Sequence, residues 1–209
     1  MHKTRKNKPK IGIFGGSFNP VHMGHLIMAQ DALEFFGLAK VLFVPCNLPP
    51  HKDPSQLASP AHRAAMLALA IRENPRFELC DLEIKKGGTN YSIDTVRHLR
   101  KIYPRHALYF IIGSDSLLEL HQWKEVNALL KLCRFVTFVR PGFELKFANK
   151  DMLRKLRKDI IDVHLVDISS TDIRRRAATG MSIRYLVPRR VEKYIARHAL
   201  YRPDCKNAP

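Results

Sequence analysis

Short apolar runs alternate with longer amphipathic segments along the chain from Lys10 onward. The runs are rich in β-branched and aromatic residues and are mostly continuous, as in strands that are buried on both faces of a parallel sheet. The segments between them have the length of crossover helices. The predicted strands are Ile11–Phe14, Val41–Pro45, Phe77–Ile84, Ala107–Ile112, Phe135–Val139 and Asp162–Val166.

Start and stop signals place helices between these runs. A first helix, Met23–Phe36, is expected to end at Gly37, because glycine adopts left-handed backbone angles easily. A second begins at Ser59-Pro60, a capping residue followed by proline at the first helical position. A third, Ser92–Tyr103, ends where a residue before proline resists helical angles. The later predicted helices are Leu117–Leu132, Lys150–Lys158, Thr171–Thr179 and Pro188–Ala199.

This alternation predicts the α/β class, with a doubly wound, Rossmann-like parallel sheet and helices on both faces. A sheet of this kind binds its ligand beyond the carboxyl ends of the strands. With 209 residues in all, one domain over residues 10–201 is expected. The basic start, residues 1–9, and the end, residues 202–209, are expected to be flexible tails.

The charge balance is strongly basic, with 36 Lys and Arg against 19 Asp and Glu and a net charge of +17. Such a surplus predicts polyanionic partners, and composition alone does not separate nucleic acids from small phosphorylated substrates. Zinc-finger spacings and aromatic RNA-binding motifs are absent from the sequence. A specific nucleic-acid partner is therefore not expected.

The four cysteines are dispersed and form no CxxC pair, as expected for reduced thiols in the cytoplasm. No apolar run approaches the roughly 18 residues of a membrane span, and the first ten residues lack the apolar stretch of a signal peptide. We therefore expect a cytoplasmic protein that makes no membrane contact. The oligomeric state stays open, and a homo-oligomer is one alternative.

A glycine-rich segment, Gly15–Leu26, follows a predicted strand and opens a helix. Glycines at this place let the backbone approach a ligand, and the new helix directs free N–H groups at anions. His22 and His25 are three residues apart, so their rings share one helical face and can both donate to one group. Metal binding and a structural role are the alternatives. Asn19 is a poor ligand and an HExxH pattern is absent, so no protein metal site is predicted.

A second segment of the same kind, Ile168–Arg174, reads ISSTDIR and leads from a strand into a helix. Hydroxyl caps, free N–H groups and Arg174 one turn later can hold a triphosphate. Taken alone, this motif also fits an ordinary capped helix. Together the two segments resemble the signatures GxFxPxHxGH and ISSTxIR of the nucleotidyltransferase superfamily of adenylyl and cytidylyl transferases, and they bracket nearly the whole domain.

The resemblance implies a site for ATP. Within that superfamily the paired histidines contact ATP phosphates, and we assign catalytic roles to His22, His25 and Arg174. The residues implied to bind ATP are Gly15, Gly16, Ser17, Phe18, His22, His25, Gly113, Asp115, Ser169, Ser170, Thr171 and Arg174.

Four further segments resemble the nicotinate-nucleotide branch: Asn47–Lys52, Asn90–Thr95, Gly113–Asp115 and Trp123-Lys124. They imply a cation for the substrate phosphate, backbone N–H groups for the nicotinate carboxylate and an indole ring that stacks on pyridine. A solvated lysine, a helix-terminal acid and a core tryptophan are the alternatives. The residues implied to bind this substrate are Asn19, Lys52, Asn90, Tyr91, Ser92, Asp115 and Trp123. Many relatives have aspartate in place of Asn19 and threonine in place of Ser92.

The implied reaction joins nicotinic acid mononucleotide to the AMP portion of ATP and releases pyrophosphate, a step of NAD biosynthesis. Mg²⁺ is the expected cofactor, held mainly by ATP phosphates and water, since this ion keeps much of its hydration. Adenylyl transfer to nicotinamide mononucleotide or phosphopantetheine is the nearest alternative. A nucleic-acid-binding protein and a nucleotide sensor without turnover are alternatives from other classes.

Overall fold

The computed structural model of the chain describes residues 8–49, 53–138, 160–161 and 167–202. Within these residues, six parallel strands form one sheet in the order β3-β2-β1-β4-β5-β6. The strands are β1 Lys10–Gly16, β2 Lys40–Pro45, β3 Phe77–Leu79, β4 Ala107–Gly113, β5 Arg134–Phe138 and β6 Ile160–Ile161. From β1 the chain adds strands first on one side and then on the other, which confirms the doubly wound prediction.

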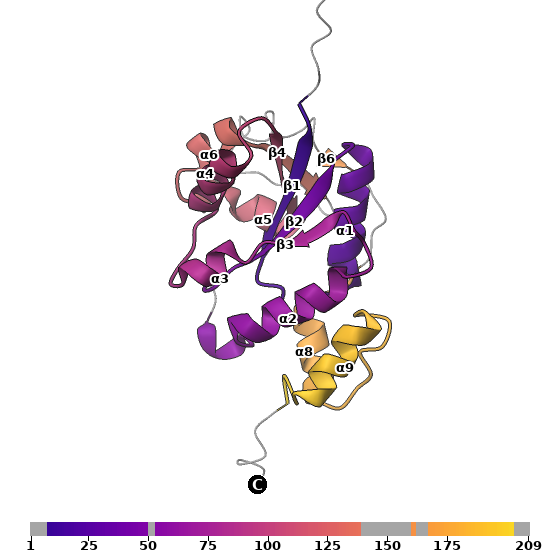
Figure 1. Cartoon of the computed structure of the whole chain (residues 1–209). Helices are drawn as coiled ribbons and strands as arrows, with labels where there is room; N and C mark the ends of the chain where they lie inside the picture. Colours follow the sequence, from indigo (N-terminus) through magenta and orange to yellow (C-terminus); the bar gives the residue numbers. More distant parts are fainter. Residues whose placement is uncertain (1–7, 50–52, 139–159, 162–166, 203–209) are drawn as a thin grey trace, which may run out of the picture.

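Helices lie on both faces of the sheet (Figure 1). One face packs against α1 and α2 and the other against α4 and α6. The helices of the described part are α1 Met23–Phe35, α2 Pro60–Ile71, α3 Leu82–Lys86, α4 Ser92–Ile102, α5 Ser114–Glu119, α6 Val126–Leu132, α8 Ser170–Ala178 and α9 Arg189–Arg197, with short 3-10 turns η1 Pro54–Gln56 and η2 Leu120–Gln122.

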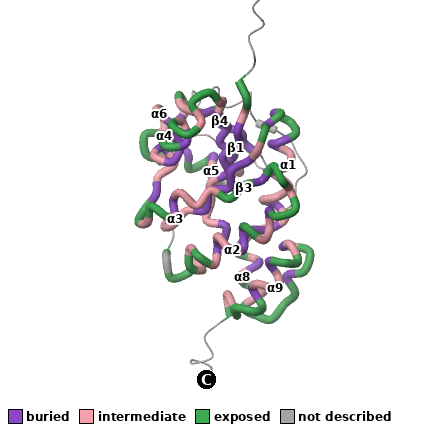
Figure 2. Tube along the Cα trace, in the orientation of Figure 1, coloured by how far each residue is buried: buried purple, intermediate pink, exposed green. Residues whose placement is uncertain are grey.

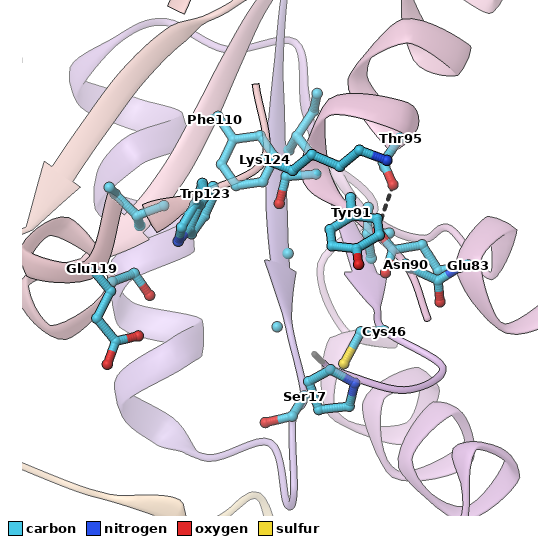
Figure 3. Close-up of a pocket in the computed structure, with 18 of the residues that line it drawn as sticks. Ser17, Cys46, Glu83, Asn90, Tyr91, Thr95, Phe110, Glu119, Trp123 and Lys124 are labelled. Atoms are coloured by element: carbon cyan, nitrogen blue, oxygen red, sulfur yellow. Dashed lines mark hydrogen bonds between the residues drawn. The ribbon is translucent and has the colours of Figure 1, made fainter. Parts of the chain in front are cut away.

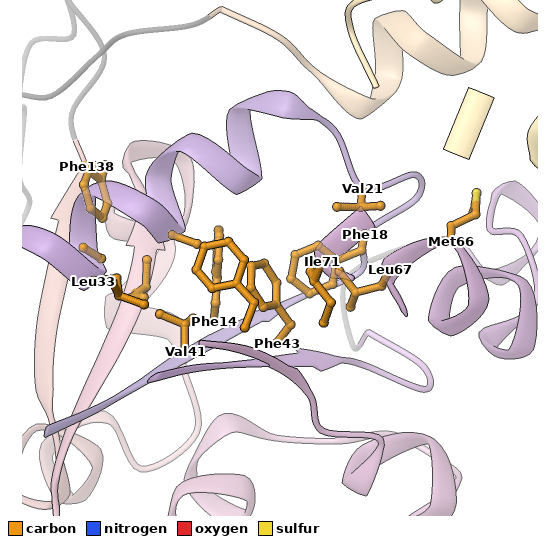
Figure 4. Close-up of a cluster of buried hydrophobic side chains, with 14 of the residues drawn as sticks. Phe14, Phe18, Val21, Leu33, Val41, Phe43, Met66, Leu67, Ile71 and Phe138 are labelled. Carbon is orange, nitrogen blue, oxygen red and sulfur yellow. The ribbon is translucent and has the colours of Figure 1, made fainter. Parts of the chain in front are cut away.

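Alternate residues of each central strand enter two separate cores. In β2, Val41 and Phe43 pack under α1 and α2, whereas Leu42 and Val44 pack under α4. All four side chains are buried, and the buried trace follows the strands through the middle of the molecule (Figure 2). Figure 4 shows the first core, where the Phe14 and Phe43 rings lie 5.6 Å apart. The strands are therefore covered on both faces, as their continuous apolar runs predict.

Local capping signals are confirmed at three helix ends. Gly37, two residues after the last residue of α1, has a φ of +59°, the left-handed conformation that glycine tolerates. The Ser59 hydroxyl accepts a hydrogen bond from the His62 N–H at the start of α2, over 3.2 Å. The α4 helix ends at Ile102, one residue before Tyr103, whose ψ of 57° is not helical.

The predicted strand Phe77–Ile84 is wrong in its second half. β3 ends at Leu79, because this edge strand pairs only with Val41–Phe43 of its single neighbour. The chain then turns into α3, which buries Glu83. A short apolar run fits a strand or a helical turn equally well. Here the length of the pairing between β3 and β2 decided where the strand ends.

The predicted helix Leu117–Leu132 is also wrong as a continuous element. It is divided into α5, η2 and α6, with Trp123 in extended conformation and Glu125 at a φ of +51°. The Glu125 carboxylate lies 2.6 Å from the Arg97 guanidinium, and the Trp123 ring packs edge-on against Phe110. Tertiary contacts therefore override the helical pattern at this place.

Several predictions fall on residues outside the described part. They are the strand Asp162–Val166, the helix Lys150–Lys158 and most of the two tails, at residues 1–7 and 203–209. The single domain stays a prediction. None of the described helices is long and apolar enough to cross a membrane.

Candidate active site

The carboxyl ends of β1 and β4 form the floor of the candidate site. β1 ends at Gly16 and β4 at Gly113, and the two strands are direct neighbours at the point where strand order reverses. A Cβ atom added at Gly15 would lie 3.3 Å from the Phe110 ring, and one added at Gly16 would lie 3.3 Å from the Phe18 ring. Glycine therefore lets the carboxyl end of β1 run close to its neighbours, at the usual ligand position of a doubly wound sheet.

The histidine pair begins α1 directly after this loop. The rings of His22 and His25 lie 3.7 Å apart at their centroids and are tilted by 30°, so the two rings share one face as predicted. The His22 N–H donates to His25 Nδ1 over 3.2 Å. A neutral imidazole that accepts at Nδ1 carries its proton at Nε2, so His25 can donate from Nε2 to a phosphate oxygen.

The second motif lies against the first. The Ser170 hydroxyl donates to the Pro20 carbonyl over 2.9 Å, and the Arg174 guanidinium donates to the Asn19 carbonyl over 3.0 Å. The Ser169 hydroxyl caps α8 by accepting from the Asp172 N–H over 3.1 Å. The two helix starts therefore meet, although about 150 residues separate Pro20 from Ser170 in the chain.

Two of the three consecutive arginines of α8 share one partner, and the third does not. Asp172 accepts from Arg175 over 2.6 Å and from Arg176 over 2.8 Å. Hydrogen bonds from Arg176 and then from Arg175 hold the pKa of this carboxyl below its usual value. Arg174 instead contacts the Asn19 carbonyl and the Thr171 hydroxyl, so its charge lies beside the loop after β1.

A cavity of about 610 Å³ extends from this loop toward α4 (Figure 3). Trp123 lies on one side of it and Tyr91 on the other, with Ser17 at one end. The Trp123 ring packs edge-on against Phe110 at 5.8 Å, and the Lys124 ammonium lies 4.5 Å from the centre of the Tyr91 ring. The cavity has the size and the aromatic walls of a site for a small flat ligand.

The N-terminus of α4 opens on the same cavity. Ser92 is the first helical residue and lines the cavity, and the Tyr91 side chain makes no capping hydrogen bond. The first N–H groups of a helix attract anions through their hydrogen atoms and the helix dipole. The predicted carboxylate-binding turn therefore lines the same cavity as Trp123.

Two residues predicted to bind substrate have their side chains engaged by the protein. The amide nitrogen of Asn19 donates to the Gln56 carbonyl, and its amide oxygen accepts from the Ala58 N–H and the Tyr201 hydroxyl, over 2.9 to 3.0 Å. Asn90 accepts from the Asn47 N–H over 3.2 Å. The structure thus places both amides in the scaffold, and their contact with substrate stays a prediction.

Other assigned residues are placed only in part. Lys52 lies outside the described residues, and of Asp115 the structure describes the helical backbone in α5 but not the side chain. Phe18 is 1% exposed, and its ring packs against His25 at 5.1 Å. Any contact of Phe18 with ATP is therefore limited to its backbone.

Glu83 was missed by the sequence reasoning. It lines the cavity, is 8% exposed, and accepts a hydrogen bond from the Thr95 hydroxyl of α4. Burial raises the pKa of this carboxyl, although the Thr95 hydrogen bond and the Lys86 charge oppose the shift. Glu83 lies in the run Phe77–Ile84 that was predicted to be a strand, and no motif spacing in the sequence marks it as a site residue.

Replacing Glu83 by glutamine is expected to flatten the dependence of stability on pH. The folded pKa is above the ordinary 4.5, so the contribution of Glu83 to stability is present below pH 4.5 and is lost as pH rises through the folded value. Glutamine keeps an acceptor for Thr95 without ionising. Urea unfolding between about pH 4 and pH 8 measures this, with Glu73→Gln at an exposed site as the control. An equal difference between E83Q and wild type at every pH would contradict it.

Comparisons with known proteins point to one family. Residues 13–176 match the model of the cytidylyltransferase-like family. A probable nicotinate-nucleotide adenylyltransferase of Opitutus terrae is 46% identical over 195 residues, covering 93% of this chain and 99% of the relative. One of Desulfitobacterium hafniense, also described as probable, is 42% identical over 198 residues, covering 92% and 96%.

A solved structure shares the fold. The nicotinic acid mononucleotide adenylyltransferase of Plasmodium falciparum, complexed with NaAD, superimposes with a TM-score of 0.78 at 22% identity. The match covers 92% of this chain and 97% of that one. This likeness shows the fold alone, and it agrees with the doubly wound sheet of the described residues.

Proposed function

The chain belongs to the cytidylyltransferase-like family, and we propose that it transfers AMP from ATP to nicotinic acid mononucleotide, giving nicotinic acid adenine dinucleotide and pyrophosphate. The observation that carries this proposal is the meeting of two helix starts beside an aromatic cavity. Ser170 and Arg174 of α8 bond to the loop that precedes the histidine pair, and the cavity opens from the same loop.

The transfer needs no nucleophile from the protein. An oxygen of the mononucleotide phosphate bonds to the α-phosphorus of ATP, and the bond from that phosphorus to the bridging oxygen breaks. Pyrophosphate leaves with the electron pair. His25 donates from Nε2 to a phosphate oxygen, and His22 and Arg174 add donors and positive charge where negative charge grows.

The cavity binds the mononucleotide. The pyridine ring of the mononucleotide lies between Trp123 and Tyr91. The nicotinate carboxylate accepts hydrogen bonds from the N–H groups at the start of α4, at Ser92. A nicotinamide carries no charge for this helix end to attract. The acid is therefore the preferred substrate.

The site would bind Mg²⁺ together with ATP. In the described part of the chain no three His, Cys, Asp or Glu side chains gather around one point. The donors beside the loop after β1 are cationic or hydrogen-bonding groups that fit phosphate oxygens, which leaves the ion to phosphates and water. When bound, it neutralises charge on the leaving pyrophosphate.

We place the reaction in the cytoplasm. Cys80 and Cys133 are both thiols in the structure. Burial raises the pKa of Cys133 to about 12, which keeps it in the unreactive thiol form. Free thiols fit a compartment in which cysteines stay reduced.

Pyrophosphate release tests the function. ATP and Mg²⁺ are supplied with nicotinic acid mononucleotide, with nicotinamide mononucleotide, with phosphopantetheine, or with no acceptor. We expect release with the acid to be at least about tenfold faster than with the amide, which corresponds to about 1.4 kcal/mol. Faster release with the amide or phosphopantetheine would overturn the substrate assignment, and release with no acceptor would make the protein a hydrolase. No release with any acceptor would favour a nucleotide sensor.

A further inference from the structure

Arg63 is a charged side chain that is completely buried. It lies in the first turns of α2 and is 0% exposed. Its guanidinium donates to four backbone carbonyls, over 2.7 to 2.9 Å. Burying a charge is costly unless it is fully hydrogen-bonded. The carbonyls belong to Ser17, Cys46, Asn47 and Ala58.

Three of the four carbonyls come from the two loops that build the site. Ser17 belongs to the loop after β1 and lies at one end of the cavity (Figure 3). Cys46 and Asn47 follow β2, and the Asn47 N–H donates to the Asn90 amide just before α4. One planar group thus holds the ATP side and the mononucleotide side of the site together.

The fourth carbonyl, that of Ala58, extends this hydrogen-bond network toward the two motifs. The N–H of Ala58, whose carbonyl accepts from Arg63, donates to the side chain of Asn19. The carbonyl of Asn19 in turn accepts from Arg174 on α8. Both motifs and the substrate cavity are therefore within a few hydrogen bonds of Arg63.

Among the described residues, no ion pair links Arg63 to a carboxylate. An apolar side chain of similar volume would avoid the cost of a buried cation, but it would leave the four carbonyls without this donor. What the guanidinium adds is a fixed fork of donors that sets the distances between four carbonyls. Lysine has one nitrogen with three donors and does not span the same set.

We propose that Arg63 is a positioning residue for the transfer step, which holds the loop after β1 and the loop after β2 at the separation that aligns the two reacting phosphates. The inference rests on the proposed adenylyl transfer. In this role Arg63 contacts neither substrate. Its effect falls on the alignment of two bound ligands, because Trp123, Tyr91 and the start of α4 still bind the mononucleotide, and the histidine pair still meets ATP, when the fork is lost.

Arg63→Lys tests this proposal. We expect kcat to fall about a hundredfold, the scale of a misplacement near 1 Å, while the Kd of each substrate changes by less than about threefold. Titration calorimetry measures the Kd of a non-hydrolysable ATP analogue and of nicotinic acid mononucleotide separately. Arg72→Lys, on the exposed end of the same helix, is the matched control and should keep the wild-type kcat.

Chemical rescue separates positioning from a purely structural role. Guanidinium chloride at about 20 mM should raise the kcat of Arg63→Ala at least about tenfold. The same concentration of sodium chloride should leave the kcat of this variant unchanged. If Arg63→Ala does not fold, as judged by circular dichroism, Arg63→Lys carries the test. Wild-type kcat in folded R63K, or loss of substrate binding in step with kcat, would overturn the proposal. Inactivity of the wild-type protein would instead overturn the proposed function.

Discussion

Replacing His25 by alanine is expected to lower kcat at least about a hundredfold. In the folded protein its Nδ1 accepts the His22 N–H over 3.2 Å, which assigns the proton of the neutral imidazole to Nε2. Removing one preorganised donor to developing negative charge typically costs about 10² to 10³ in kcat. Pyrophosphate release at saturating ATP and nicotinic acid mononucleotide measures the effect.

Stability must be followed in the same variant. His25 also packs against the rings of Phe14 and Phe18 and receives the N–H of the helix-capping residue, so its loss is expected to weaken the fold by about 1 kcal/mol. Activity is therefore measured well below the unfolding temperature. His98→Ala, at an exposed position of α4, serves as the control. A near-normal kcat in folded H25A would remove His25 from the mechanism.

Replacing Arg174 by alanine is expected to lower kcat/KM for ATP by about a hundredfold or more. Its guanidinium lies against the Asn19 carbonyl, in the loop before the histidine pair, and a charge-assisted bond to phosphate there is about twice as strong as a neutral one. Steady-state kinetics with varied ATP measure the loss. Arg174→Lys is expected to recover only part of it, because lysine lacks the fork.

The neighbouring arginine provides the control for this prediction. Arg175 is on the same helix and is held by Asp172 over 2.6 Å, so Arg175→Ala should change kcat/KM for ATP no more than a few-fold. Equal losses in R174A and R175A would show that the overall charge of α8 matters and that the position of Arg174 does not. A loss confined to nicotinic acid mononucleotide would move Arg174 to the other substrate.

Most of the sheet was predictable because apolar runs in a parallel sheet are long and continuous. β1, β2, β4 and β5 begin and end within about two residues of the predicted bounds, and the two cores follow from alternation along these strands. The errors fall on the edge strand β3 and on the broken helix around Trp123. At both places pairing or packing with distant residues decided the outcome, and no local pattern records those contacts.

The candidate site was predictable where a motif carries its own local geometry. The histidine pair and the capped start of α8 each need only a strand, a turn and a helix start, so their residues were found from spacing. Arg63 and Glu83 were missed, because each acts through groups that folding brings to it. Asn19 and Asn90 were assigned to substrate binding, whereas in the folded chain their side-chain amides form hydrogen bonds to the backbone of neighbouring loops.

The order of apolar and polar residues was therefore sufficient to specify the doubly wound class, the helix starts and the residues able to meet phosphates. Folding had to supply the relation between distant segments: the bonds of Ser170 and Arg174 to the loop after β1, and the buried fork of Arg63 between two loops. The reason is physical. Local propensities act over a few residues, whereas a site for two substrates depends on distances between segments that only a packed sheet brings together.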